Sequence, residues 1–384
     1  MSVINLDLWI PSLFDTKGGI QVYSRYLLDA LGCLYPEACR TVTLKNDFAK
    51  TLPRSTNGLE YFATGQMPLP RRTLSFAYRL ISRNLRQPAD LIISTHLNFT
   101  VAGWLLKQLK GIPYWTVAHG IEAWGIKSWP LKLALRQADC ILAVSHYTRD
   151  RLIREQNLNP NKVVVLPNTF DASRFKPGPK PEYLLKKHRI SHDQPVLLTV
   201  SRLAEQERYK GYDQVLKALP DIQKAIPNIH YVLVGKGPDR SRIEYLIEQL
   251  GLKSCVTLAG FIPDKQLGDY YNLCDVFAMP SKREGFGIVY LEAMASGKPV
   301  LGGNRDGAVD ALCHGELGVL VDPDNISEIA EVLIQLFEGN HHNSLLYRPT
   351  ALRQKAIDTY GLAAFHHSLA RLMDTHYHQK VITR

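Results

Sequence analysis

Short apolar segments alternate along this chain with longer amphipathic ones. The apolar segments are rich in β-branched residues and bounded by polar turns, which predicts buried strands. We expect these strands at 90–94, 114–119, 140–145, 162–167, 196–201, 230–235, 256–260, 276–280, 299–303 and 318–322. Helical spacing occupies many of the intervals, for example 212–226 and 242–251. This alternation predicts parallel sheets with helices on both faces.

A stretch rich in proline and glycine divides the pattern in two. Pro177, Gly178, Pro179 and Pro181 mark a linker. We therefore expect an N-terminal domain over 1–167 and a C-terminal domain over 168–359, and a chain of 384 residues suits two domains. The predicted fold class is α/β, with two doubly wound, Rossmann-like domains and a cleft between them. Ligands of such sheets bind beyond the carboxyl ends of the strands.

The composition argues against a membrane-spanning, a secreted or a disulfide-bonded protein. The hydrophobic share of 45% and the charged share of 21% are ordinary for a globular protein. The longest uncharged run, 91–106, is too short and too polar to span a membrane. The N-terminus lacks the basic region of a signal peptide. Because the six cysteines include no CxxC pair, we predict reduced core thiols in a cytoplasmic protein.

The basic character belongs to the first half. Residues 1–168 hold 20 of the 46 basic residues but only 11 of the 36 acidic ones. Within this half, 68–88 predicts a helix with apolar residues on one side (Leu74, Ala77, Ile81, Leu85) and arginines on another (Arg72, Arg79, Arg83, Arg86). This pattern is typical of a helix at an anionic membrane surface or near a lipid-pyrophosphate acceptor. A solvated surface helix is the alternative, and nucleic acid is not expected because no aromatic residues interleave the charges.

Two cations follow the strand at 196–201. Arg202 and Lys210 lie in the loop SRLAEQERYKG, and Gly211 permits a tight entry into the next helix. Arginine and lysine together suit a diphosphate. A solvated loop is the alternative, because Glu205 and Glu207 lie among them.

Two glutamates bracket the segment EGFGIVYLE. After the strand at 276–280, a helix begins near Gly287 and Ile288, and its free N–H groups predict an anion site. In one continuous helix, Glu284 and Glu292 would stand ~12 Å apart, farther than the carboxyl pair of a glycosidase. We interpret them as groups that bind hydroxyls, one on the hexose and one on the ribose of a sugar nucleotide. Solvation of the helix surface is the alternative for Glu292, but it explains Glu284 beside Gly-Phe-Gly less well.

Other motifs give weaker indications. Gly235 and Gly237 begin a dinucleotide-type pattern, but Arg240 replaces its third glycine, so a dehydrogenase is not favoured. Either a plain turn or a backbone approach to a nucleotide explains the two glycines. Asp322 and Asp324 mimic a metal-binding DxD, but they lie in a predicted turn, and we expect no metal there.

Together these segments resemble the GT-B glycosyltransferases of family 4, which use nucleotide sugars and retain the anomeric configuration. The matching segments are KGGIQVYSRYL, TVAHG, VLPNTFDASRFKP, SRLAEQERYKGYD, LVGKGPD, VTLAGFIPD, EGFGIVYLEAMASGKPVL and GVLVDPDN. The resemblance implies that Arg202 and Lys210 neutralise the donor diphosphate, that Glu284 grips the donor hexose and that Glu292 binds the ribose. Lys210 stands eight residues after Arg202, a longer spacing than the family usually shows.

The resemblance also implies contacts from the backbone. Phe286, Gly287 and Ile288 would offer N–H groups to the phosphates or the sugar, and the backbone near Phe261 and Ile262 would hold the base.

In the N-terminal domain, the resemblance implies that Gly18 and Gly19 close over the diphosphate and that His119 contacts the donor sugar near its reacting face. It further implies that a C-terminal helix, about 360–384, rejoins this domain. The family usually has an acidic residue after a Gly-Gly turn, and we expected Asp310 to fill that position.

The expected activity is transfer of a hexose from a nucleotide sugar to a hydroxyl of a saccharide or lipid-linked acceptor in polysaccharide biosynthesis. UDP-glucose is the first donor expected and GDP-mannose the second, with no metal or other cofactor. The alternatives are a nucleotide-sugar epimerase or hydrolase on the same fold and a non-catalytic nucleotide-sugar-binding subunit. The expected location is the cytoplasm, with peripheral attachment to the inner face of the membrane if the arginine helix binds lipid.

Overall fold

The computed structural model describes residues 3–16, 18–55 and 58–378. Its contacts divide the chain into two compact units, the first formed by 1–168 with 365–384 and the second by 169–364. The sequence predicts a boundary between residues 167 and 168 and a return of the chain to the first domain at about residue 360. The predicted C-terminal segment over 379–384 lies outside the described residues.

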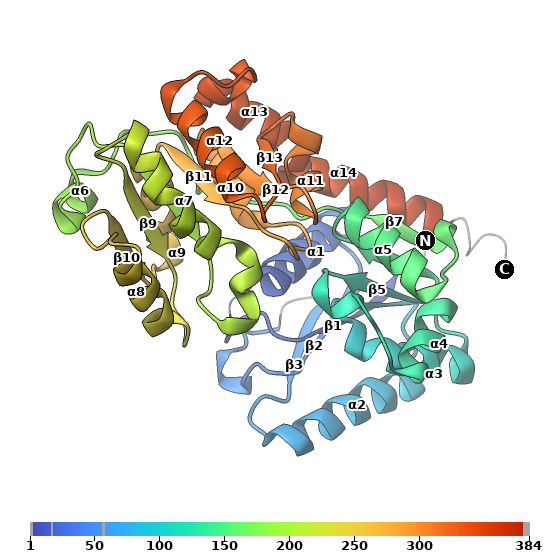
Figure 1. Ribbon diagram of the computed structural model, residues 1–384. Helices are drawn as coiled ribbons and strands as arrows, with labels where there is room; N and C mark the ends of the chain where they lie inside the picture. The colour runs from blue at the N-terminus through green and yellow to red at the C-terminus, as the bar shows by residue number, and fades with distance from the viewer. Residues whose placement is uncertain (1–2, 17, 56–57, 379–384) are drawn as a thin grey trace. The chain divides into compact units, whose positions relative to one another are not determined.

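The first unit contains a parallel sheet of seven strands in the order β3-β2-β1-β4-β5-β6-β7 (Figure 1). The strands are β1 (Asn5–Ile10), β2 (Cys39–Leu44), β3 (Leu59–Ala63), β4 (Leu91–Ser94), β5 (Tyr114–Ala118), β6 (Cys140–Ala143) and β7 (Val163–Val165). The four strands predicted here, β4 to β7, are confirmed. The prediction missed β1, β2 and β3, because polar residues interrupt β1 and β2 and because the edge strand β3 is largely half-buried.

Helices cover both faces of this sheet (Figure 1). They are α1 (Gly19–Leu34), α2 (Leu69–Arg86), α3 (Thr100–Lys110), α4 (Trp129–Gln137), α5 (His146–Gln156) and α14 (Leu362–Met373), the last continued by a π-helical turn at Asp374–His378. Most of α14 belongs to this unit. Its Phe365 packs edge-on against Tyr23 of α1, with ring centroids 5.8 Å apart.

The second unit contains a parallel sheet of six strands in the order β10-β9-β8-β11-β12-β13. All six strands were predicted, and they are β8 (Val196–Val200), β9 (His230–Val234), β10 (Val256–Gly260), β11 (Val276–Met279), β12 (Val300–Gly303) and β13 (Val319–Val321). The helices are α6 (Glu182–His188), α7 (Tyr212–Ala225), α8 (Arg240–Gln249), α9 (Asp264–Leu273), α10 (Ile288–Ala295), α11 (Ala308–Ala311), α12 (Ile326–Glu338) and α13 (Pro349–Tyr360).

The strand order of the second sheet reverses between β8 and β11. From β8 the chain continues to β9 on one side, and from β11 it continues to β12 on the other. The loops after β8 and β11 therefore diverge at a topological switch point, which is where ligands of doubly wound sheets bind. The corresponding reversal in the first sheet lies between β1 and β4.

The structure corrects the predicted orientation of α2. Phe76, Leu80 and Asn84 form its buried side, whereas Leu74 and Leu85 are exposed. Asn84 is buried because its amide donates to the buried carboxylate of Asp7 at 2.5 Å, a pairing that the apolar pattern cannot reveal. The buried side is therefore rotated away from the predicted one.

Two further predictions about surfaces are corrected or limited. Arg72 is not free for a ligand, because its guanidinium donates to the carbonyls of Met67 and Gly65. All six cysteines are unbridged, but Cys33 and Cys39 are exposed rather than in the core. Within the described ranges, no helix has the length and apolar character that crossing a membrane requires.

Candidate active site

An ion pair joins the two loops at the switch point of the second sheet. Lys210 ends a 3₁₀ helix (Glu205–Lys210) after β8, and its Nζ lies 2.5 Å from Glu284 Oε2 in the loop after β11. Both side chains are largely buried, with 16% and 17% of their areas exposed. The loops can approach because residue 211 is glycine: its φ is +87°, and a Cβ there would stand 2.2 Å from the Pro280 carbonyl oxygen. Despite its long spacing from Arg202, Lys210 thus meets Glu284.

The charge of Lys210 is fixed by its surroundings. Burial lowers the pKa of Lys210, but the carboxylate of Glu284, with Tyr209 and Glu207, outweighs burial and raises that pKa above its ordinary value. Burial raises the pKa of Tyr209 to about 12. Lys210 therefore stays cationic across the physiological range.

Arg202 is arranged differently. Its side chain is 73% exposed and forms an ion pair with Oε1 of Glu207. The other oxygen of the buried Glu207 carboxylate, Oε2, has no hydrogen-bond partner among the described residues. The structure places Arg202 on the same loop as Lys210 but outside the Lys210–Glu284 contact.

Asp306 holds the loop that carries Glu284. Its buried carboxylate accepts hydrogen bonds from Ser281 Oγ at 2.7 Å, from the Glu284 N–H at 2.6 Å and from the Ala308 N–H at 2.9 Å. Burial raises the pKa of Asp306 to about 7. The sequence analysis named only Asp310, which is also buried, and missed Asp306. Its position, three residues after Gly303, was the available signal.

The loop ends at the N-terminus of α10. Gly287 caps the helix with φ +92°, and the N–H groups of Phe286, Gly287 and Ile288 have no hydrogen-bond partner within the described part of the chain. The Phe286 ring is buried against Tyr360 at a centroid distance of 5.3 Å, which anchors the loop. Free N–H groups at a helix N-terminus, beside Lys210, form a site suited to an anion.

Glu292 lies farther along α10. Its Oε2 accepts a hydrogen bond from Tyr271 of α9 at 2.8 Å, and burial raises the pKa of Glu292 to about 7. The Phe175 and Phe277 rings pack against Tyr271 at 5.7 and 5.8 Å. The sequence did not indicate Tyr271, because its partner belongs to a separate helix.

Phe261 and Ile262 follow β10 and differ in exposure. The Phe261 ring is 52% exposed, and Lys236 Nζ lies 4.7 Å from its centroid, whereas Ile262 is buried. The turn before Lys236 requires glycine, because a Cβ at Gly235 would stand 1.7 Å from the Ser201 carbonyl oxygen. This close approach to protein backbone favours the plain-turn explanation for the glycine pair.

The predicted residues of the first unit lie after β1 and β5. Gly18 caps α1, and Gly19 is its first residue. His119 Nε2 lies 2.9 Å from the Thr95 carbonyl oxygen, so this nitrogen carries the proton, and the His119 backbone N–H donates to Glu122 Oε1 at 2.5 Å. Burial lowers the pKa of His119 to about 4, so the imidazole is neutral at pH 7.

The aspartates of the DxD-like turn are already paired. Arg305 forms ion pairs with both Asp322 and Asp324, and Lys282 forms one with Asp324. Across the described ranges, no group of three or more histidine, cysteine, aspartate or glutamate side chains is arranged to hold a metal ion.

Family models match both halves of the chain. "Glycosyltransferase Family 4" matches residues 37–174, and "Glycosyl transferases group 1" matches residues 182–353. The GDP-mannose-dependent alpha-(1-6)-phosphatidylinositol monomannoside mannosyltransferase of Mycolicibacterium smegmatis is 33% identical over 224 residues, which is 55% of this chain and 57% of that protein. The chain thus matches only about half the length of the first such relatives.

Solved structures share the fold over nearly the whole chain. Sucrose-phosphate synthase of Thermosynechococcus elongatus has a TM-score of 0.81 at 20% identity, with 99% of this chain and 100% of that chain covered. Anabaena HepE, solved with UDP and glucose, has a TM-score of 0.77 at 21% identity, with 97% and 100% covered. Two doubly wound units with these neighbours define the GT-B fold. The chain belongs to the family 4 glycosyltransferases.

Proposed function

We propose that this protein transfers a hexose from a nucleotide sugar to a hydroxyl of a saccharide or lipid-linked acceptor, with retention and without a metal ion. The observation that carries the proposal is the Lys210–Glu284 pair beside the free N–H groups of α10, at the switch point of the sheet. A cation and a helix N-terminus bind the diphosphate, and the adjacent carboxylate accepts hydrogen bonds from hexose hydroxyls.

The two candidate donors are UDP-glucose and GDP-mannose. The relatives at 33% identity are named GDP-mannose-dependent, whereas HepE, solved with UDP-glucose, is only 21% identical. These names support GDP-mannose more strongly than the sequence alone did. The phosphatidylinositol mannoside in the relatives' name supports a lipid-linked acceptor.

The proposed mechanism stabilises the leaving diphosphate. As the bond to the sugar breaks, negative charge gathers on the phosphates, and Lys210, the N–H groups at 286–288 and the exposed Arg202 offset it. Glu284 orients the hexose, and Glu292 binds the ribose. With no protein nucleophile proposed, the acceptor hydroxyl attacks from the face that the diphosphate leaves and passes its proton to a phosphate oxygen.

A turnover assay separates this proposal from its alternatives. UDP-glucose and GDP-mannose are incubated in EDTA, with and without a mixture of lipid and oligosaccharide extracts, and nucleoside diphosphate release and sugar products are measured. We expect release that depends on the acceptor mixture. Release without acceptor indicates a hydrolase, and an altered sugar without release indicates an epimerase. Binding without any conversion indicates a non-catalytic subunit, and each of these three outcomes contradicts the proposal.

We also propose that an anionic membrane surface is a partner and that the protein acts at the inner face of the membrane. The exposed part of α2 supports this partner, since Arg71, Arg79 and Arg86 lie there beside exposed Leu74 and Leu85. The helix contains no acidic residue. Arg72 has no part in this proposal, because backbone carbonyls already bind it.

Donor affinity is expected to depend on pH through Glu292. Its raised pKa, about 7, means that the carboxyl is protonated below pH 7 and loses charge-assisted bonds to the ribose, so affinity rises as pH increases from 6 to 8. Stability changes in the opposite direction. Between pH 5 and 7 the Glu292 carboxyl binds a proton in the folded state but not in the unfolded state, so its contribution to the free energy of unfolding is lost as pH rises through 7.

Glu292→Gln is the test, measured by donor titration and thermal unfolding across this range. We expect weaker donor binding and a smaller pH dependence of both quantities. Asp306, whose pKa is also about 7, leaves a residual stability change. The exposed Glu331→Gln is the control. An unchanged pH dependence in Glu292→Gln contradicts the assignment.

A further inference from the structure

A hollow of about 540 Å³ lies between α2 and the edge strand β3. Arg79, Arg83 and Arg86 line it from α2, and their spacing of three and four residues places them on one side of the helix. Ser82 of α2 and Phe62 of β3 complete much of the wall. The donor site described above uses none of these residues.

The positive charge of the hollow is positioned but only partly neutralised. The guanidinium carbons of Arg79 and Arg83 lie 4.9 and 5.6 Å from the centroid of the Phe62 ring, which holds them by cation–π contact. Arg83 also lies 3.7 Å from the exposed carboxylate of Glu60. Arg79 and Arg86 form no ion pair with any acidic residue of the described ranges. Such a hollow attracts an anion.

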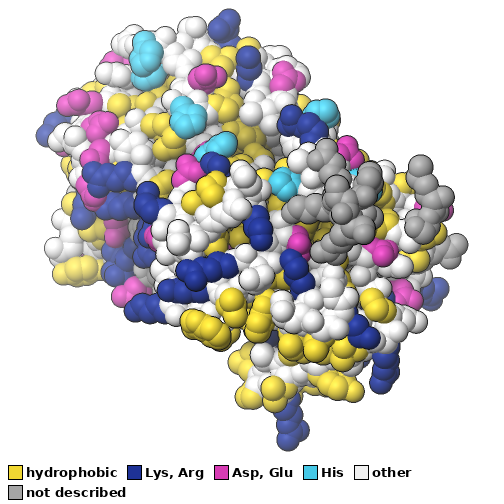
Figure 2. Space-filling view, turned by 90° about the vertical axis from the view of Figure 1, so that its right-hand side faces the viewer, with side chains coloured by type: hydrophobic (Ala, Val, Ile, Leu, Met, Phe, Trp, Pro, Cys, Tyr) yellow, Lys and Arg dark blue, Asp and Glu magenta, His cyan; other side chains and the backbone are white. Residues whose placement is uncertain are grey.

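The chemistry of the walls fits a phosphate. Guanidinium groups bind phosphate oxygens bidentately, and three of them line the hollow. Exposed apolar side chains lie beside the arginines on the same helix: Leu74 is 72% exposed, Tyr78 69% and Leu85 39%. In Figure 2, the lowest part of the molecule, where α2 lies, exposes yellow apolar side chains together with dark-blue basic ones.

We propose that this hollow binds the headgroup phosphate of an anionic phospholipid, while Leu74, Tyr78 and Leu85 enter the membrane interface. The apolar residues select a lipid over a soluble phosphate, because they are useful only where acyl chains begin. This proposal rests on the proposed membrane partner. It adds a discrete phosphate-binding site to the general electrostatic attraction between the arginines and an anionic membrane.

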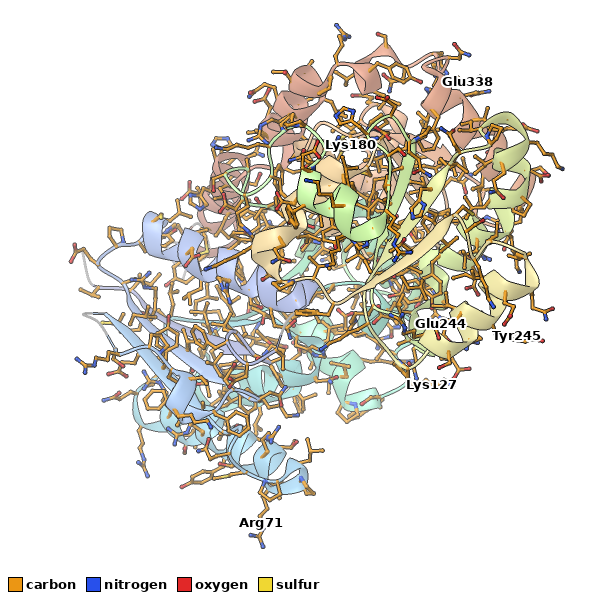
Figure 3. All side chains as sticks on the ribbon, turned by 90° about the vertical axis from the view of Figure 1, so that its left-hand side faces the viewer. Arg71, Lys127, Lys180, Glu244, Tyr245 and Glu338 are labelled. Atoms are coloured by element: carbon orange, nitrogen blue, oxygen red, sulfur yellow. The ribbon has the colours of Figure 1, made fainter. Side chains whose placement is uncertain are left out.

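A matched pair of charge removals tests the site. Arg71 is exposed on the same helix, points away from the body of the protein in Figure 3 and is not part of the hollow. Arg71→Gln and Arg86→Gln therefore remove the same charge from the same helix. The measurement is co-sedimentation with phosphatidylcholine vesicles that contain phosphatidic acid, with thermal unfolding to verify the fold of each variant.

We expect Arg71→Gln to weaken partitioning about fivefold, as for any basic residue near an anionic surface. Arg86→Gln should weaken it about 50-fold or more, because charge-assisted hydrogen bonds to the phosphate are also lost. Arg86→Lys keeps the positive charge but loses the planar guanidinium group that binds phosphate bidentately. We therefore expect its loss of partitioning to lie between those of Arg71→Gln and Arg86→Gln.

Other outcomes overturn the proposal in distinguishable ways. Equal losses in Arg71→Gln and Arg86→Gln show general electrostatics without a site. Binding of glycerol 3-phosphate that needs Arg86, without vesicle binding, shows a soluble phosphate ligand. No vesicle binding by the unaltered protein at low salt contradicts both the site and the membrane partner. Failure of hexose transfer is a separate result, because the turnover assay with soluble acceptors needs no membrane.

Discussion

Lys210→Met is expected to reduce kcat with the preferred donor by about 10²–10³-fold. Methionine keeps the length of the side chain but removes the charge that offsets the leaving diphosphate, and loss of one preorganised group of this kind costs about 3–4 kcal/mol of barrier. The measurement is steady-state transfer at saturating donor. KM is expected to change less than kcat, because charge on the diphosphate grows toward the transition state.

Two controls make this result interpretable. Lys224→Met removes an equivalent charge from an exposed side chain that pairs with its helical neighbour Asp221, and we expect near-normal turnover. Because Lys210→Met leaves the Glu284 carboxylate without its partner, thermal unfolding must show that the variant is folded under assay conditions. Normal kcat in a folded Lys210→Met variant would exclude Lys210 from transition-state stabilisation.

Glu284→Gln is expected to lower kcat/KM by about 10–100-fold and to change the pH profile. The fall follows from the loss of hydrogen bonds between a charged acceptor and the hexose hydroxyls, worth about 1.5–3 kcal/mol. The change in profile follows from Lys210, whose pKa Glu284 raises against the opposing effect of burial. Without Glu284, burial dominates, the Lys210 pKa falls, and activity is lost at a lower alkaline pH than in the unaltered protein.

The comparison with Glu331→Gln, an exposed helix position, controls for charge removal in general. A double variant, Lys210→Met with Glu284→Gln, should lose less than the two single effects combined, because the residues act as a pair. If activity of the Glu284→Gln variant falls at the same alkaline pH as activity of the unaltered protein, the contact between Lys210 and Glu284 does not govern activity.

The second unit could be predicted well from its sequence because its strands are continuous apolar runs. Such runs identify strands buried on both faces, and all six were found. In the first unit, β1, β2 and β3 carry polar residues, and only their neighbours make them strands. The side of α2 that is buried also depended on a tertiary contact, between Asn84 and Asp7.

The residues of the candidate site also divide into those that follow predicted strands and those that depend on tertiary contacts. Lys210, Glu284 and the start of α10 follow predicted strands directly, so their meeting at one edge of the sheet could be expected. Asp306 and Tyr271 could not be assigned in this way, because each acts through hydrogen bonds to another segment. The resemblance suggested Asp310 after the Gly-Gly turn, and only the hydrogen bond to the Glu284 loop reveals the part that Asp306 plays.

The central claim is that the loops after β8 and β11 bind the diphosphate of a nucleotide sugar. Calorimetric titration of UDP-glucose and GDP-mannose in EDTA tests it most directly, with the unaltered protein, Lys210→Met and Lys224→Met compared. We predict that one of the two donors binds at one site per chain and that Lys210→Met weakens this binding about tenfold or more while Lys224→Met leaves it unchanged. If the unaltered protein binds neither donor, or if the two lysine variants bind equally well, the claim is contradicted.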